Sequence, residues 1–298
     1  MKRKKLKIGY FADGKWSHRA FLKIIDDNRF DIRFIVPRID TNDNTLLTFS
    51  KKYNIDYLKL ENVNSNKSLK IINNYSCDLF VSMSFNQIFK KQIINLTSIG
   101  IINCHAGKLP FYRGRNVLNW ALINDEKEFG ITVHFVDEGI DTGDIIFQKT
   151  FTILEKDNYN SLLNKAYINC SNMLLEALGM ILKGDYKRIK QKKIHPVGFY
   201  CGYRSEGDEI INWNDSSRNI FNFIRAITLP GPIARTNYKN NEIRINNSNY
   251  IKNAPSYIGI PGQVLSKTKK GFIVKTKDSF IEILEVQGEL RVGNKLGK

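Results

Sequence analysis

An asparagine and a histidine stand two residues apart in the stretch INCHAGKLPFYRG, at positions 103 and 105. Side chains alternate along an extended chain, so Asn103 and His105 project to one side and Cys104 to the other. An asparagine amide can donate a hydrogen bond to a developing oxyanion, and a histidine exchanges protons near neutral pH. The pair therefore suits acyl transfer through a tetrahedral intermediate.

A carboxylate that can orient this histidine or stabilise its positive charge occurs in the later stretch DEGIDTGD, where Asp141 lies between two apolar segments. Those segments, in GITVHFVDEGIDTGDIIFQKTF, predict two strands around a turn. Because sequential elements usually pack together, we expect the turn beside the end of IINCH. The alternative interpretation is that His105 is a structural polar residue at a strand end.

The elements that must position these residues follow a βαβα rhythm in the first half of the chain. Short apolar runs that predict strands alternate with helical patterns, in LKIGYFA, SHRAFLKIID, FDIRFIVP, TLLTFSKKY, IDYLKL, CDLFVSM, FNQIFKKQIINL and IGIINCH. This rhythm predicts an α/β fold with a mostly parallel sheet. Ligands of such sheets bind beyond the carboxyl ends of strands, where Met83–Asn86 and Asn103–His105 fall.

The second half of the chain has a different pattern. A long amphipathic helix is expected from NYNSLLNKAYINCSNMLLEALGMILKG, and a charged linker follows Gly184. A helix with Asp215 as its N-cap and several short alternating segments come next. We expect a catalytic domain over residues 1–184 and a smaller β-rich domain over residues 185–298.

The composition is that of a folded protein with no membrane span. Of the 298 residues, 42% are hydrophobic and 25% charged, and no apolar run approaches the roughly 18 residues that would cross a bilayer. The cysteines, Cys77, Cys104, Cys170 and Cys201, form no C-x-x-C pair, which argues against a disulfide framework or a zinc site. The turn DEGIDTGD lacks the ligand pattern of a calcium loop. We therefore expect a cytoplasmic protein with no metal.

The net charge of +17 attracts anions without choosing between nucleic acid and nucleotides. Residues 184–298 hold 20 Lys and Arg against 10 Asp and Glu, which gives the C-terminal part +10 of that total. The runs KRIKQKK and SKTKK carry no interleaved aromatic residues, so solvated surface charge is their simplest interpretation.

Three separated motifs together resemble the folate-dependent formyltransferases: Asn-x-His, a Leu-Pro-x-x-Arg-Gly loop and an Asp-x-Gly turn. They occur in this order between Ile101 and Gln148. The resemblance implies a Rossmann-like catalytic domain and gives Asn103, His105 and Asp141 the catalytic roles. It also implies N10-formyltetrahydrofolate as formyl donor and a primary amine as acceptor.

The resemblance places the pteridine between MSFN and the turn after Val136. The residues it implies for this contact, chiefly through their backbone, are Met83, Ser84, Phe85, Asp137 and Gly139. The alternative is that these are ordinary strand-to-helix connections.

The acceptor amine is the open question. The loop HAGKLPFYRGRNVLNWA and the opening FADGKWSHRAF look closer to sugar N-formyltransferases than to methionyl-tRNA formyltransferases. This implies a dTDP-linked 3-amino-3,6-dideoxyhexose for surface polysaccharide such as the O-antigen of lipopolysaccharide, with a 4-amino or UDP-linked sugar as variants.

In that role Tyr112, Arg113 and Arg115 would contact the diphosphate or sugar, and Trp16 would stack on the base or pack over the sugar. A solvated loop and a half-buried core residue are the alternatives. A methionyl-tRNA formyltransferase and a catalytically inactive sugar or folate binder are the alternative functions. A homodimer is implied by family likeness, and neither a membrane nor a nucleic acid is an expected partner.

Overall fold

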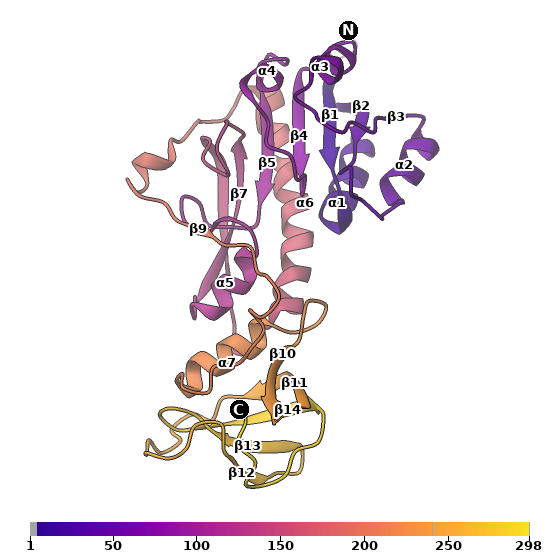
Figure 1. Ribbon diagram of the computed structural model, residues 1–298. Helices are drawn as coiled ribbons and strands as arrows, with labels where there is room; N and C mark the ends of the chain where they lie inside the picture. The colour runs from indigo at the N-terminus through magenta and orange to yellow at the C-terminus, as the bar shows by residue number, and fades with distance from the viewer. Residues whose placement is uncertain (1–4, 240, 298) are drawn as a thin grey trace. The chain divides into compact units, whose positions relative to one another are not determined.

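A seven-stranded sheet carries the Asn-x-His stretch. The computed structural model describes residues 5–239 and 241–297, and the strand order in this sheet is β3-β2-β1-β4-β5-β7-β8. The strands are β1 (Leu6–Ala12), β2 (Phe30–Val36), β3 (Asp56–Tyr57), β4 (Leu79–Met83), β5 (Ile101–His105), β7 (Glu128–Phe135) and β8 (Ile145–Thr152). The first five are parallel and β7 runs antiparallel to β5 (Figure 1). The predicted α/β fold with a mostly parallel sheet is confirmed.

Helices cover both faces of this sheet, as the alternation of side chains in β1 requires. The ring of Tyr10 contacts the ring of Phe21 on α1 (Gly14–Ile25). The ring of Phe21 in turn stacks on that of Phe49 on α2 (Thr45–Tyr53). Phe11 points to the opposite face, into a buried cluster that includes Ile72 of α3 (Asn66–Asn73). The resulting rigid frame fixes the strand ends at which the chemistry-bearing side chains lie.

The long helix α6 (Tyr159–Lys183) ends one residue before Gly184, as the amphipathic pattern predicted. The thiol of Cys104 on β5 donates to the carbonyl of Cys170 on α6, with 3.5 Å between sulfur and oxygen. Cys104 therefore faces the helix, and its neighbours on β5 face away from it.

The C-terminal part holds a five-stranded antiparallel sheet in the order β10-β11-β14-β13-β12. Its strands are β10 (Ala234–Tyr238), β11 (Asn241–Asn249), β12 (Val264–Lys267), β13 (Gly271–Lys275) and β14 (Phe280–Gln287). The helix α7 (Ser217–Ala226) precedes them, and α5 (Val117–Ile123) belongs to the same unit. The expected smaller β-rich domain is confirmed, whereas its boundary at residue 184 stays a prediction.

The two compact units alternate along the chain. The first comprises Met1–Gly114, Gly130–Phe151 and Lys165–Tyr200. The second comprises Arg115–Phe129, Thr152–Asn164 and Cys201–Lys298. Asn103, His105 and Asp141 all lie in the first unit, so their geometry is a property of that unit alone.

Two local expectations were wrong. The helix predicted from FNQIFKKQIINL is reduced to α4 (Lys91–Ile94). The reason is that the Asn64 side chain donates to the carbonyl of Ile88 and accepts from the N–H of Lys90, so these backbone groups are not free for helical hydrogen bonds. The N-cap of α7 is Ser216 and not Asp215, since the Ser216 hydroxyl accepts from the N–H of Asn219.

Candidate active site

Asn103 and His105 project from the same side of β5, as alternation predicted, and both reach Asp141. The Asn103 Nδ2 lies 3.4 Å from Asp141 Oδ1, and the His105 Nδ1 lies 3.6 Å from Asp141 Oδ2. The expected approach of the turn to the end of β5 is therefore observed. It follows from the antiparallel pairing of β5 with β7, the strand that leads into the turn.

Asp141 sits at the centre of the group in a left-handed backbone conformation, with φ of 53°. Its Oδ2 accepts the N–H of Gly114 at 2.9 Å, and its Oδ1 also lies 3.4 Å from Nε2 of His134. Burial alone would raise the pKa of Asp141, but the neighbouring His105, the His134 contact and the Gly114 N–H together hold that pKa well below its ordinary value. The carboxylate is thus ionised over the whole physiological range.

His134 is a member of this group that the sequence analysis did not identify. It pairs with Asn103 across the β5–β7 ladder and is 2% exposed. Its Nδ1 lies 2.7 Å from the Phe135 carbonyl, which can only accept, so Nδ1 carries a hydrogen. Its Nε2 faces the Asn103 amide at 3.3 Å. The available signal was a histidine inside the apolar run GITVHF, where a buried polar residue needs a partner.

The ring of His105 is fixed from its other side by the loop that follows β5. Its Nε2 lies 2.7 Å from the backbone oxygen of Tyr112. A Cβ on Gly107 would come within 2.3 Å of that oxygen and 2.4 Å of Nε2, so only glycine permits this approach. The side chain of Tyr112 is buried against Phe199, and its carbonyl is the part that touches the candidate catalytic residue His105. Its contact with substrate stays a prediction.

The two arginines of the predicted acceptor loop have aromatic neighbours. Arg113 donates from Nε and Nη2 to Oε1 of Gln191, at 3.1 and 2.6 Å, and its guanidinium lies over the ring of Tyr200. Arg115 lies over the ring of Tyr203, 5.7 Å from its centroid. Neither contact neutralises the positive charge, which suits the predicted contact with phosphate.

Trp16, the predicted base- or sugar-stacking residue, packs edge-on against Tyr167 of α6 with 4.6 Å between ring centroids. It is half-buried in this position. The packing is the core role that the sequence analysis named as the alternative, and the stacking role stays a prediction.

The residues predicted to line the pteridine site lie at the end of β4. Met83 is buried, and its carbonyl accepts from the N–H of Asp13 at 3.1 Å. Ser84 has φ of 55°, and Phe85 packs its ring against Phe11. The side chain of Phe85 thus serves the core, which leaves backbone groups for the predicted ligand contact.

The second part of the predicted pteridine site is a turn that Asp137 organises. Its Oδ1 accepts from the N–H of Gly139 and from the hydroxyl of Thr142. A Cβ on Gly139 would lie 2.1 Å from that hydroxyl oxygen. Gly139 is therefore required for the tight turn that ends next to Asp141, and its contact with the pteridine stays a prediction.

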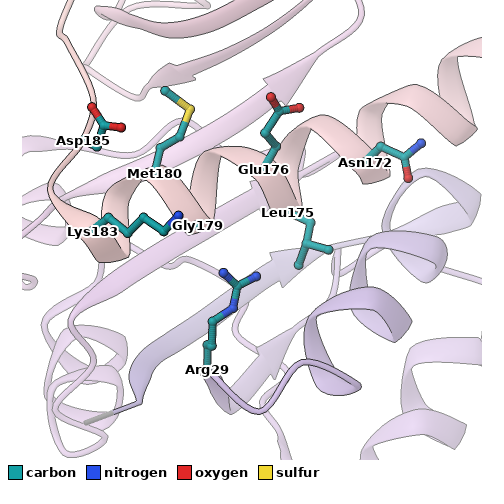
Figure 2. A pocket seen from close by; sticks show the side chains of 8 residues that line it. All are labelled: Arg29, Asn172, Leu175, Glu176, Gly179, Met180, Lys183 and Asp185. Carbon is teal, nitrogen blue, oxygen red and sulfur yellow. The ribbon is translucent and has the colours of Figure 1, made fainter. Parts of the chain in front are cut away.

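A separate pocket of about 340 Å³ lies along α6 (Figure 2). The side chains that line it are Arg29, Asn172, Leu175, Glu176, Gly179, Met180, Lys183 and Asp185. Arg29 immediately precedes β2, so the pocket adjoins the amino end of that parallel strand, whereas the candidate catalytic residues Asn103 and His105 lie at the carboxyl end of β5. No predicted site residue lines it.

Neither a metal cluster nor a membrane span occurs in the described chain. Within residues 5–239 and 241–297, no three His, Cys, Asp or Glu side chains are grouped so that they could hold a metal ion. Across the same ranges, every helix is too short or too polar to cross a bilayer.

A Rossmann-like sheet with an amide, an imidazole and a carboxylate beyond its strand ends is an arrangement suited to a group-transfer enzyme. Residues 31–178 match the formyl transferase family, and residues 205–291 match the C-terminal domain of formyl transferases. Methionyl-tRNA formyltransferase of Fusobacterium nucleatum is 33% identical over 253 residues, which are 83% of this chain and 79% of that protein. The chain belongs to the formyl transferase family and is a folate-dependent formyl-transfer enzyme.

Two solved structures are similar over most of the chain. The sugar 3N-formyl transferase WlaRD, crystallised in the presence of dTDP and 5-N-formyl-THF, superimposes with a TM-score of 0.72 at 25% identity and covers 96% of this chain and 100% of its own. The N-formyltransferase of Helicobacter canadensis has a TM-score of 0.67 at 22% identity, covering 95% and 100%, and shares the fold.

Proposed function

We propose that this enzyme transfers the formyl group of N10-formyltetrahydrofolate to the amino group of a dTDP-linked 3-amino-3,6-dideoxyhexose. The observation that carries this proposal is the match to WlaRD over 96% of this chain and 100% of that one, at a TM-score of 0.72. Arg113 and Arg115 support it, because their guanidinium groups contact a neutral amide and aromatic rings among the described residues, and arginine forks suit diphosphate oxygens. The product would serve surface polysaccharide, and a homodimer is part of the same prediction.

The catalytic group supplies each element that the reaction needs. The new bond joins the acceptor nitrogen to the formyl carbon, and the bond from that carbon to N10 breaks as N10 gains a proton. Asn103 donates from Nδ2 to the oxyanion of the tetrahedral intermediate. The ring of His105 takes up the proton that the acceptor amine loses, and Asp141, ionised and 3.6 Å away, holds the ring and stabilises the charge it gains.

His134 would act on the amide in this scheme. Its Nε2 lies 3.4 Å from Asp141 Oδ1 and 3.3 Å from Asn103 Nδ2, so the ring restricts both the carboxylate and the amide. Asn103 donates one amide hydrogen to Asp141 Oδ1 at 3.4 Å, which leaves the other hydrogen for the oxyanion. A hydrogen-bond donor that is oriented before the reaction begins stabilises the transition state more than one that must first reorient.

A methionyl-tRNA acceptor is the second candidate. It is favoured by curated relatives such as two methionyl-tRNA formyltransferases that are 33% and 31% identical over 83% and 81% of this chain. The charge of +10 over residues 184–298 would serve phosphate contacts in that case.

A formylation assay with N10-formyltetrahydrofolate tests the proposal. The acceptors offered are dTDP-3-amino, dTDP-4-amino and UDP-4-amino deoxysugars and methionyl-tRNA, each at matched concentration. We expect the highest kcat/KM for a dTDP-3-amino sugar. Turnover of the tRNA alone would overturn the sugar proposal. A kcat/KM that is higher for a 4-amino or UDP-linked sugar than for the dTDP-3-amino sugar would overturn the proposed identity of the acceptor sugar.

A further inference from the structure

Gln191 is a buried amide within the basic run KRIKQKK, which from sequence alone was interpreted as a solvated linker. It begins the 3-10 turn η1 (Gln191–Lys193) and is 3% exposed, whereas Lys190 and Lys192 on either side are exposed. The linker is held to the sheet just before this point, because Ile189 and Ile145 exchange two backbone hydrogen bonds of 2.9 Å. Gln191 is therefore placed inward by its backbone.

The amide of Gln191 makes four hydrogen bonds. Its Nε2 donates to the carbonyls of Asp141 and Gly143, each at 2.8 Å. Its Oε1 accepts from Nε and Nη2 of Arg113. Two donated and two accepted hydrogen bonds exhaust what a glutamine amide can form. One side chain thus links the turn that carries Asp141 to the arginine of the acceptor loop.

The two carbonyls that Gln191 holds bracket a tight turn. Asp141 has a positive φ, a conformation that is unfavourable for a residue with a Cβ and persists only when the surroundings determine it. A Cβ on Gly143 would lie 1.9 Å from the Phe135 oxygen, so this part of the turn packs directly on β7. Gln191 holds the carbonyls of Asp141 and Gly143, on the side of the turn that does not pack on β7. By holding the backbone of Asp141 it also fixes the direction of the Asp141 carboxylate.

Arg113 is held by the same segment. Its guanidinium lies 5.4 Å from the centroid of Tyr200. A Cβ on Gly198 would lie 2.8 Å from Cζ of Arg113, so the chain passes close beside the guanidinium. Since a guanidinium has five N–H donors and Gln191 takes two of them, three remain for a further acceptor. Because Gln191 is neutral, the charge of Arg113 stays available to an anion.

We propose that Gln191 is a positioning residue that holds the Asp141 turn and the Arg113 guanidinium in one arrangement, so that it acts on both catalysis and acceptor recognition. The inference rests on the proposed roles of Asp141 and Arg113. It predicts two separable effects, one on kcat through the turn and one on the acceptor KM through the arginine.

The test is steady-state kinetics of Gln191→Met, with Gln287→Met as the matched control. Gln287 is exposed on β14 in the C-terminal unit. We expect Gln191→Met to lower kcat by on the order of 10-fold or more, because small displacements of a catalytic group are costly. The acceptor KM should rise and the KM for N10-formyltetrahydrofolate should stay within about twofold, as should every parameter of the control.

Two further variants separate the halves of the amide. Gln191→Glu keeps oxygens that can accept from Arg113 but removes both donors to the turn, so its kcat should fall as far as that of Gln191→Met. Arg113→Met leaves those donors in place, so its acceptor KM should rise while its kcat changes less. In the double variant Gln191→Met/Arg113→Met, the acceptor KM should be no higher than in Arg113→Met alone, since nothing remains to be positioned.

The outcomes distinguish this inference from the proposed function. Folding of each variant is checked by near-ultraviolet circular dichroism, and Gln191→Glu and Arg113→Met carry the test should Gln191→Met not fold. A kcat within twofold of wild type in folded Gln191→Glu, or KM effects that multiply in the double variant, would overturn the positioning role. If the wild-type enzyme formylates methionyl-tRNA alone, only the proposed sugar acceptor is overturned, and the same variants are then measured with that substrate.

Discussion

The Nε2 of His105 lies 2.7 Å from the carbonyl oxygen of Tyr112, and this contact determines which nitrogen of the ring serves the site. A carbonyl only accepts, so Nε2 carries a hydrogen, and Nδ1 is the nitrogen turned toward Asp141. The loop after β5 therefore selects the tautomer and orients the ring before any substrate arrives.

Replacing either member of the His105–Asp141 pair should abolish most catalysis. We expect His105→Asn and Asp141→Asn to lower kcat by about 10²–10⁴-fold, the usual contribution of a positioned acid or base. The measurement is formyl transfer under saturating donor and acceptor. Retention of more than about a tenth of wild-type kcat would make the assigned roles untenable.

The approach of His105 to Tyr112 depends on Gly107. We expect Gly107→Ala to lower kcat by at least about 10-fold, because the added Cβ would come within 2.4 Å of His105 Nε2 and force the ring to move. Gly202→Ala is the matched control, since a Cβ there meets nothing within 4 Å. Equal kinetics for the two variants would argue against a fixed ring orientation.

The low pKa of Asp141 predicts a pH-dependent contribution to stability. Because this pKa is lower in the folded chain than in the unfolded one, the contribution is complete above about pH 4, the ordinary Asp pKa, and is lost as the pH falls toward the folded pKa. Urea unfolding of wild type and Asp141→Asn should therefore differ in free energy at pH 7 and converge below about pH 4.

The exposed Asp185 provides the control for this pH experiment. The difference in free energy of unfolding between wild type and Asp185→Asn should not change with pH over the same range. A difference for Asp141→Asn that stays constant with pH would show that the carboxylate gains nothing from His105, His134 and Gly114.

Lys275 tests stability separately from catalysis. Its side chain is fully buried in the C-terminal unit, and its Nζ donates to the carbonyls of Tyr257, Thr276 and Ser279 at 2.8, 2.8 and 3.1 Å. We expect Lys275→Met to lower the free energy of unfolding by about 1–3 kcal/mol, because buried carbonyls lose their donor. Measured at 25 °C on folded enzyme, kcat should stay near wild type, and a loss of kcat with unchanged stability would contradict this structural role.

The sequence by itself determined the strands of the sheet, the shared direction of Asn103 and His105, and the motifs that define the family. These features depend on local periodicity or on contiguous residues, which a single chain displays directly. The strand β5 ends where the apolar run IGIINCH indicated and begins two residues after the start of that run, and the turn at Asp141 was recognisable between two strands.

Only the tertiary structure decided which polar residues complete the site. His134 reaches the group because β7 pairs antiparallel with β5 in the register that sets it opposite Asn103. Gln191 reaches it because Ile189 of the linker pairs with Ile145 at the start of β8. Both contacts join residues far apart in the chain through pairing and burial, and local patterns do not encode such partners.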